Sequence, residues 1–329
     1  MTSPPAREIS GIIPTVGRAD MLRLCLESVT RQTVPVAEVI VVHCGADAET
    51  RAVTGDPRWG AAGVEVRYFP FAEKNAAAQR NFAIQQARHD NLLLLDDDVE
   101  LAPAWAESLF APIWGDRTVG ATMGRLVNQP LAPPTALWRV YRRLVASGRV
   151  AFEPGRLVGA ALPNGFPITV ERPMPSEWLG GGVSAIRRAA FVSVGGFAPY
   201  FSGSSPGEDL DLGYRLSRHW RVLFVPAARC VHHEDPRGRS HSRDYQFQSM
   251  RARYAIVMRA FGASRVGALA HVMLWMIFQA ISEVASLRKG WSPSLPSAWW
   301  GRLRGVGSCL TWVPPANRNE PALFPGSGA

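Results

Sequence analysis

Lysine and cysteine are the two residues that this sequence has least of. The four cysteines lie far apart and form no CxxC pair, so neither a disulfide framework nor a zinc knuckle is expected. No targeting signal stands in the first residues, and we expect a protein that stays in the reducing cytoplasm. Lysine occurs only at Lys74 and Lys289, so arginine supplies almost all the positive charge behind the formal net charge of +9. This excess reflects either GC-rich coding or an anionic partner, such as a substrate phosphate, a lipid head group or a nucleic acid.

The order of apolar runs predicts an α/β fold. The chain has 329 residues, of which 47% are apolar and 19% charged, and this composition excludes wholesale disorder and coiled-coil rods. Strands are predicted at residues 8–15, 38–43, 64–69 and 91–95, and helices at residues 20–32 and 75–88. Strands that alternate with helices indicate parallel pairing with both faces of the sheet covered. The run at 64–69 alternates apolar and polar residues, which is typical of a more exposed strand.

The second half of the chain is less regular. After a helix at 103–110 and a strand at 119–127, residues 129–177 are rich in proline, and we expect loops around a basic helix at 137–147. Order resumes with a helix at 208–218, a strand at 221–226 and a long helical stretch at 244–287. The tail after Gly290 is rich in proline, glycine and tryptophan, and we expect it to be irregular.

Three consecutive aspartates, Asp96, Asp97 and Asp98, directly follow the apolar strand NLLLL. Ligands of open parallel sheets bind beyond the carboxyl ends of strands. Adjacent carboxylates repel one another and their oxygens suit Mg²⁺ or Mn²⁺, which proteins commonly share with substrate phosphates. Asp96 and Asp98 would point to the same side of an extended segment. The alternative is a solvated acidic turn that caps the next helix.

Two further segments carry candidate chemistry. In GEDLDLGYRL, Glu208 and Asp209 lie near a helix start, where the helix dipole favours negative charge or where a carboxylate could act as a general base. An ordinary aspartate is already ionised at neutral pH. In VHHEDP, His232 and His233 follow a strand. They would point to opposite sides of an extended chain, so at most one is expected to bind a metal ion.

The order of these features resembles the nucleotide-sugar-dependent, inverting glycosyltransferases of family 2. The matching stretches lie between residues 9 and 233 and include GIIPTVGRADMLRLCLESVTRQT, NAAAQRNFAIQQAR, LLLLDDDVELAP, EWLGGGVSAIRRAAFVSVGGF and GEDLDLGYRLSRHWRVLFVPAARCVHH. The resemblance implies a GT-A fold, with a Rossmann-like, mostly parallel sheet flanked by helices and a C-terminal helical appendage. It implies a glycosyltransferase domain at 1–235, with a nucleotide-binding half at 1–128 and an acceptor-binding half at 129–235. Beyond the resemblance, the apolar helical run predicts a C-terminal helical extension at 236–329, for which association with a membrane is one alternative.

The resemblance also implies site residues. Pro14 and Thr15 would end the first strand beside the nucleotide, and Asp96 and Asp97 would face the ribose and diphosphate. The metal ion, Mn²⁺ or Mg²⁺, would be bound by Asp98 and by His232 or His233. Arg18 and Arg80 would contact the nucleotide, unless they form ordinary salt bridges.

On the acceptor side, Asp209 matches the family's catalytic base and Glu208 its neighbour. Trp178, Gly180 and Gly181 match the segment that lines the sugar and acceptor pocket. One departure concerns the nucleobase: His43 stands where the family usually has an aspartate that binds it, which leaves thymine and guanine donors open beside uracil.

The predicted reaction moves a sugar from a nucleoside diphosphate to an acceptor hydroxyl with inversion, on a lipid-linked or saccharide acceptor of the cell envelope. Two rival interpretations stay open. A metal-dependent nucleotidyltransferase would also need carboxylates beside a diphosphate, and a non-catalytic basic membrane-binding module would explain the arginines. Nucleic acid is not an expected partner, because no basic stripe with interleaved aromatic residues is present.

The apolar run at 266–287 could cross a hydrocarbon layer of about 30 Å, but His271, Gln279 and Glu283 would be costly in lipid. Three placements therefore remain open: a helix in the head-group region on the inner face of the membrane, a packed core or dimer helix, and a true span.

Overall fold

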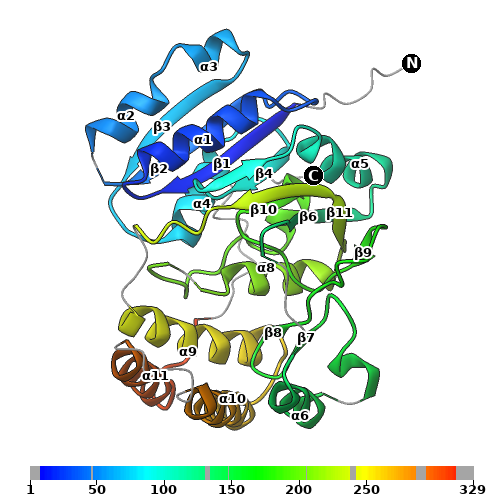
Figure 1. Ribbon diagram of the computed structural model, residues 1–329, viewed down its shortest axis with the longest axis vertical. Helices are drawn as coiled ribbons and strands as arrows, with labels where there is room; N and C mark the ends of the chain where they lie inside the picture. Colours follow the sequence, from blue (N-terminus) through cyan, green and yellow to red (C-terminus); the bar gives the residue numbers. More distant parts are fainter. Residues whose placement is uncertain are drawn as a thin grey trace.

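The computed structural model describes residues 8–45, 47–129, 134–146, 148–204, 206–237, 242–286 and 294–315. A large sheet with helices on both faces forms the upper part of the molecule, and a layer of helices lies beneath it (Figure 1). The described strands are β1 (Ile9–Thr15), β2 (Glu38–Cys44), β3 (Glu65–Phe71), β4 (Asn91–Leu95), β5 (Val99–Leu101), β6 (Val119–Leu126), β7 (Leu157–Val158), β8 (Leu162–Pro163), β9 (Met174–Pro175), β10 (Val183–Arg187) and β11 (Arg221–His232).

The described helices alternate with these strands and then continue alone. They are α1 (Ala19–Thr30), α2 (Ala48–Thr54), α3 (Arg58–Ala61), α4 (Ala76–Gln86), α5 (Trp105–Gly115), α6 (Ala136–Val145), α7 (Arg188–Ser193), α8 (Glu208–Ser217), α9 (Ser242–Arg259), α10 (Arg265–Ser286) and α11 (Leu295–Cys309), with a short 3₁₀ helix at Gly148–Ala151. The α/β class and the elements expected up to residue 95 are confirmed.

The main sheet has the strand order β3-β2-β1-β4-β10-β6-β11-β5, and β9 pairs with β11. Strands β1 to β4 are parallel. Because β10 is antiparallel to both β4 and β6, and β11 is parallel to β6, β6 and β11 run in the direction of β1 to β4. The sheet is thus mostly parallel by strand direction, and it extends without a break from the first half of the chain into the second.

Helices cover both faces of the sheet, as the uniformly apolar strand β4 requires. Successive leucines of β4 enter different cores: Leu93 and Leu95 pack with α1 and α5, whereas Leu92 and Leu94 pack with α4, α7 and α8. The exposed edge is β3, whose residues are mostly half-buried, in agreement with its alternating sequence. Strands β1 and β4 are parallel neighbours. Their carboxyl ends therefore lie side by side near the middle of the sheet.

Two expectations for the C-terminal part were wrong. The helical stretch at 244–287 is two helices, because the chain turns between α9 and α10 through Gly262, which has φ +71°; its last residue and Lys289 lie outside the described residues. The tail expected to be irregular contains α11. A Cβ on Gly301 or Gly305 would lie within 3 Å of the Arg243 or Phe247 carbonyl oxygen of α9, so these glycines serve close helix packing rather than a loop.

Candidate functional site

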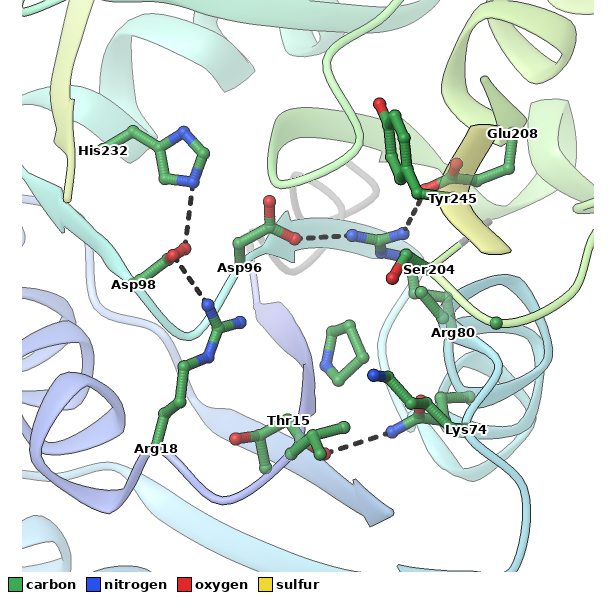
Figure 2. Close-up of a pocket in the computed structure, with 15 residues that line it drawn as sticks. Thr15, Arg18, Lys74, Arg80, Asp96, Asp98, Ser204, Glu208, His232 and Tyr245 are labelled. Atoms are coloured by element: carbon green, nitrogen blue, oxygen red, sulfur yellow. Dashed lines mark hydrogen bonds and ion pairs between the residues drawn. The ribbon is translucent and has the colours of Figure 1, made fainter. Parts of the chain in front are cut away.

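A cavity of about 260 Å³ opens at the carboxyl ends of β1 and β4 (Figure 2). Its remaining walls come from α4, α8, the end of β11 and the start of α9. The lining residues are Pro14, Thr15, Val16, Arg18, Lys74, Ala76, Gln79, Arg80, Asp96, Asp98, Gly203, Ser204, Glu208, His232 and Tyr245. Eight of the residues singled out in the sequence therefore meet here: Pro14, Thr15, Arg18, Arg80, Asp96, Asp98, Glu208 and His232.

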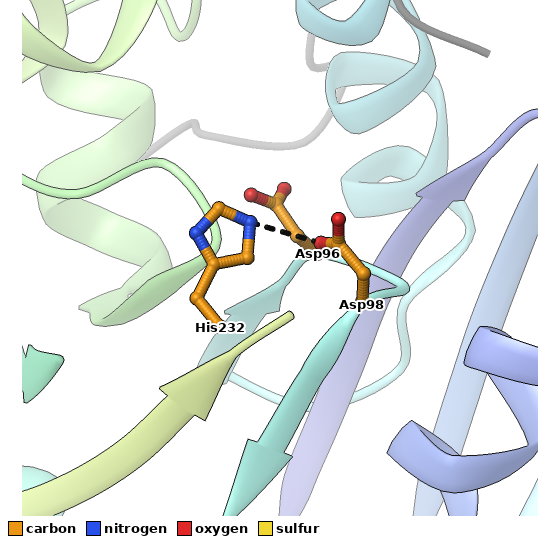
Figure 3. Close-up of side chains that lie close together, drawn as sticks. All are labelled: Asp96, Asp98 and His232. Carbon is orange, nitrogen blue, oxygen red and sulfur yellow. Dashed lines mark ion pairs between the residues drawn. The ribbon is translucent and has the colours of Figure 1, made fainter. Parts of the chain in front are cut away.

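Asp96, Asp98 and His232 form a compact cluster on one wall of this cavity (Figure 3). One side-chain ligand atom from each lies within 4.8 Å of the others, and His232 Nε2 is 3.0 Å from Asp98 Oδ1. The antiparallel pairing of β11 with β5 sets this contact, because it places His232 opposite Val99. Asp96 and Asp98 both line the cavity, although residues 97–98 form a turn and not the extended segment on which the prediction from sequence depended.

The cluster has the chemistry of a divalent-metal site. Burial raises the pKa of Asp98, but the hydrogen bond with His232 and the charge of Arg18 outweigh burial and hold this pKa below its usual value. Asp98 is therefore a carboxylate at neutral pH. Two carboxylates and one imidazole are hard or borderline ligands that suit Mn²⁺ or Mg²⁺, and three protein ligands leave positions for substrate oxygens. The residues present fit such an ion.

Asp97 takes a different part from its two neighbours. Its side chain is fully buried and does not line the cavity. It accepts a hydrogen bond of 2.5 Å from Thr15 Oγ1 and forms an ion pair with Arg18, whose Nη1 also lies 2.8 Å from Asp98 Oδ2. Burial raises the pKa of Asp97 to about 7. The structure does not bring Asp97 to the face where ribose or diphosphate was expected; Asp97 instead holds Arg18 beside the acidic cluster.

Arg80 joins the acidic loop to α8. It is 3% exposed; its Nη2 lies 2.6 Å from Asp96 Oδ1 and its Nη1 lies 2.7 Å from Glu208 Oε1, as Figure 2 shows. Burial and the neighbouring Asp209 raise the pKa of Glu208 to about 8. Of the two roles expected for Arg80, contact with the nucleotide or an ordinary salt bridge, the structure contains the salt bridges, and Arg80 also lines the cavity.

Asp209 lies just behind this wall and does not line the cavity. Its Oδ2 accepts a hydrogen bond of 3.0 Å from the Gly181 backbone N–H, and its Oδ1 accepts one of 2.8 Å from the Leu210 N–H. Burial raises the pKa of Asp209 above the ordinary aspartate value, so the environment of this carboxyl is not that of a free aspartate. Two backbone donors fix its orientation towards the glycine segment.

The glycine segment passes close to both carboxyl groups. A Cβ on Gly181 would lie 3.3 Å from Asp209 Cβ, and one on Gly182 would lie 2.1 Å from Asp96 Cγ. Gly180 and Gly181 are therefore next to the site without lining the cavity. Trp178 stands further off, and its Nε1 donates to the Asn164 carbonyl oxygen at 3.3 Å.

Two predicted histidines lie away from the cavity. His43 is buried at the end of β2, where its Nδ1 is 3.0 Å from Tyr68 Oη and its Nε2 is 2.9 Å from Asp47 Oδ2. His233 Nε2 lies 3.3 Å from Glu100 Oε2, on the other side of the chain from His232, so the prediction that the adjacent histidines diverge is confirmed.

Sequence reasoning missed several lining residues: Val16, Lys74, Ala76, Gln79, Gly203, Ser204 and Tyr245. Lys74 had a visible signal, because it is one of only two lysines and precedes Asn75, which caps α4 by accepting from the Ala78 N–H. Tyr245 had none, because it belongs to α9, beyond the segment that carried the motifs.

Part of the chain matches a known protein family and several curated proteins. Residues 10–143 match the sequence model described as "Glycosyl transferase family 2". The chain is 30% identical over 241 residues to the O-antigen biosynthesis protein RfbC of Myxococcus xanthus, covering 69% of this chain and 17% of that protein. It is 44% identical over 70 residues to the N-acetylglucosaminyl-diphospho-decaprenol L-rhamnosyltransferase of Mycobacterium tuberculosis, covering 20% of this chain and 22% of that protein. The matched part of the chain thus spans less than a quarter of the length of each of these two relatives.

The fold has solved counterparts. The mannosyltransferase PcManGT from Pyrobaculum calidifontis, in complex with GDP-Man and Mn²⁺, superimposes with a TM-score of 0.52 at 16% identity, covering 94% of this chain and 87% of that chain. This likeness, shared by other glycosyltransferase structures, shows the GT-A fold. Residues 10–143 thus have the sequence of glycosyl transferase family 2, and the chain has the GT-A fold.

Proposed function

We propose that this protein is an inverting glycosyltransferase that moves a sugar from a nucleoside-diphosphate sugar to an acceptor hydroxyl. The observation that carries the proposal is the meeting of Asp96, Asp98 and His232 on one wall of a cavity whose other wall carries Glu208, with Asp209 directly behind. A leaving diphosphate needs positive charge on one side, and an attacking hydroxyl needs a base on the other.

The donor side is built for a diphosphate. Asp96, Asp98 and His232 would hold Mn²⁺ or Mg²⁺, which supplies Lewis-acid stabilisation of the charge on the departing diphosphate. PcManGT, which shares the fold, is a complex with GDP-Man and Mn²⁺, and this supports the choice of ion. Arg18, tied to Asp97 and Asp98, and Lys74 add cationic groups to the same cavity. Pro14 and Thr15 would bound the nucleotide, whose base stays unassigned because His43 is turned into the fold.

Asp209 is the proposed base. Its two oxygens accept backbone hydrogen bonds from Gly181 and Leu210, which orient the carboxylate and stabilise its charge against the effect of burial. Glu208 is engaged by Arg80 and is a positioning residue. The Asp209 carboxylate would take the acceptor proton during a single displacement, which inverts the anomeric carbon. Trp178, Gly180 and Gly181 would border the acceptor.

A lipid-linked or saccharide acceptor of the cell envelope is the best supported class. One relative is named for a diphospho-decaprenol acceptor and another for O-antigen biosynthesis. A lipid-linked acceptor requires work at a membrane surface, and the compartment expected from the unpaired cysteines is the cytoplasmic side.

The test is a donor panel with Asp209→Asn. Wild-type protein should release nucleoside diphosphate from one nucleotide sugar in the presence of Mn²⁺ or Mg²⁺ and an acceptor. Asp209→Asn should lose about 10²–10⁴-fold in transfer yet keep its affinity for the nucleoside diphosphate, whereas Asp116→Asn, an exposed site away from the cavity, should keep both. Release of pyrophosphate would assign a nucleotidyltransferase instead, and undiminished turnover by Asp209→Asn would remove the base assignment.

A further inference from the structure

Helix α10 presents an unbroken apolar stripe to solvent. The exposed residues of its middle and ends recur at three- and four-residue spacing: Val266, Ala270, Met273, Ile277, Ile281 and Val284. Val266 is 79% exposed and Val284 66%. At about 1.5 Å per residue the stripe is roughly 27 Å long. Soluble proteins rarely expose contiguous apolar surface of this extent without a partner.

The opposite face of α10 is already occupied. Val272, Trp275 and Phe278 are buried in the core that α10 shares with α6, α9 and α11. Phe278 packs against Tyr141 of α6 with ring centroids 5.2 Å apart. Of the described helices, α10 alone has the length and composition to cross a membrane, but this packing leaves only one of its faces for lipid.

The neighbouring helices continue the apolar surface. Figure 1 shows α11, α10 and α6 side by side along the lower edge of the molecule, beneath α9. Val140 and Leu144 of α6 are exposed, as are Trp300 and Leu303 of α11. The exposed apolar residues therefore belong to three adjacent helices at one end of the molecule.

The charge of these helices is strongly one-sided. Within the described parts of α6, α10 and α11 there are six arginines, Arg139, Arg142, Arg143, Arg265, Arg302 and Arg304, against one carboxylate, Glu283. Glu283 is neutralised by Arg302 at 2.8 Å. Arg139, Arg143 and Arg304 are exposed and stand beside the apolar stripes. An apolar strip with cationic margins complements an anionic lipid surface, where acyl chains take the apolar residues and head groups take the arginines.

A second copy of the chain fits this surface less well. A two-fold interface brings the same patch against itself, so the exposed arginines of one copy would face those of the other with no exposed carboxylate from these helices to offset them.

We propose that α6, α10 and α11 form a docking surface that lies in the head-group region of an anionic membrane. Binding of this surface to a membrane does not depend on the proposed function, but its role in bringing an acceptor to the site does. Helix α9 separates this surface from the cavity, since Tyr245 lines the cavity while Met250 and Tyr254 face α10 and α11. A membrane held against α10 would thus bring a lipid-linked acceptor to within one helical layer of the donor.

The experiment is flotation of the full chain with vesicles of phosphatidylcholine alone and of an equimolar mixture with phosphatidylglycerol. Wild type should bind the mixed vesicles and bind the neutral ones far less. Ile277→Glu with Ile281→Glu should abolish binding, and Arg139→Gln with Arg143→Gln should weaken binding to the mixed vesicles by about fivefold for each charge removed. Leu24→Glu, an exposed leucine on α1, is the matched control and should bind as wild type.

Circular dichroism and nucleoside diphosphate binding of each variant, measured in the absence of lipid, separate loss of docking from misfolding and from failure of the proposed function. Equal flotation of wild type and the Ile277/Ile281 variant would overturn the proposal. A lipid-free dimer that the same two substitutions convert to a monomer would overturn it too, because the surface would then be a subunit interface. Extraction only by detergent, and not by carbonate at high pH, would instead indicate a spanning helix.

Discussion

His232 Nε2 lies 3.0 Å from Asp98 Oδ1, and the pairing of β11 with β5 creates this contact. His233 is the next residue in the sequence, but its side chain contacts Glu100 and not Asp98. The chain therefore offers two adjacent histidines of which one is built into the acidic cluster, and this difference can be measured.

His232→Ala should weaken Mn²⁺-dependent binding of a nucleoside diphosphate by about tenfold or more, because a ligand of the metal ion is removed. His233→Ala should leave this binding within about twofold, because its imidazole is directed away from the cluster. Isothermal titration with and without Mn²⁺ provides the comparison. If the two variants behave alike, or if His233→Ala is the weaker binder, the metal site is assigned to the wrong residues.

Arg80→Gln should lower the free energy of unfolding by about 3 kcal/mol, because it removes the buried cation that pairs with Asp96 and hydrogen-bonds to Glu208. Arg88→Gln, two residues beyond the end of α4, removes an exposed pair with Glu65 and should change stability little. Urea unfolding at neutral pH measures both. Equal effects for the two variants would mean that Arg80 does not hold the acidic loop to α8.

Gly182→Ala should abolish donor binding, because its Cβ would come within 2.1 Å of Asp96 Cγ and force the carboxylate out of the cluster. Gly60→Ala is the matched control: it lies on α3, and a Cβ there meets nothing within 4 Å. Thermal shifts with nucleoside diphosphate and Mn²⁺ report binding by mass action. A Gly182→Ala protein that retains the full ligand-induced shift would contradict the close approach.

Glu208 should make stability depend on pH in an uncommon direction for a carboxyl group. Its pKa rises from the ordinary 4.5 to about 8 in the folded protein, so the folded state binds the proton more tightly than the unfolded chain. The free energy of unfolding should therefore fall as the pH rises through this window. Glu208→Gln should flatten the decline, as measured by urea unfolding at several pH values between the two. Identical slopes for wild type and variant would show that Glu208 ionises as an ordinary glutamate.

The local sequence determined the elements and most of the donor side. Apolar runs ended by polar residues fixed β1, β2 and β4, since a strand covered on both faces must be apolar throughout. Because parallel strands end at one edge of a sheet, Thr15 and the three aspartates had to meet there. Glu208, Asp209 and the two histidines lie far away in the sequence, and no local pattern predicts that they reach the same edge of the sheet. Only the resemblance to the family predicted that they share a site with the aspartates.

Only the tertiary structure decided which of these residues share the cavity and what each faces. Asp97 and Asp98 are adjacent in sequence and both pair with Arg18, yet only Asp98 lines the cavity. Both belong to the turn between β4 and β5, and the packing around that turn decides which of the two side chains reaches the cavity. Tyr245 reaches the cavity, and Gly301 and Gly305 allow α11 to pack, through contacts between segments far apart in the chain. Such contacts depend on how whole helices and strands pack together, so they cannot be predicted from the pattern of neighbouring residues in the sequence.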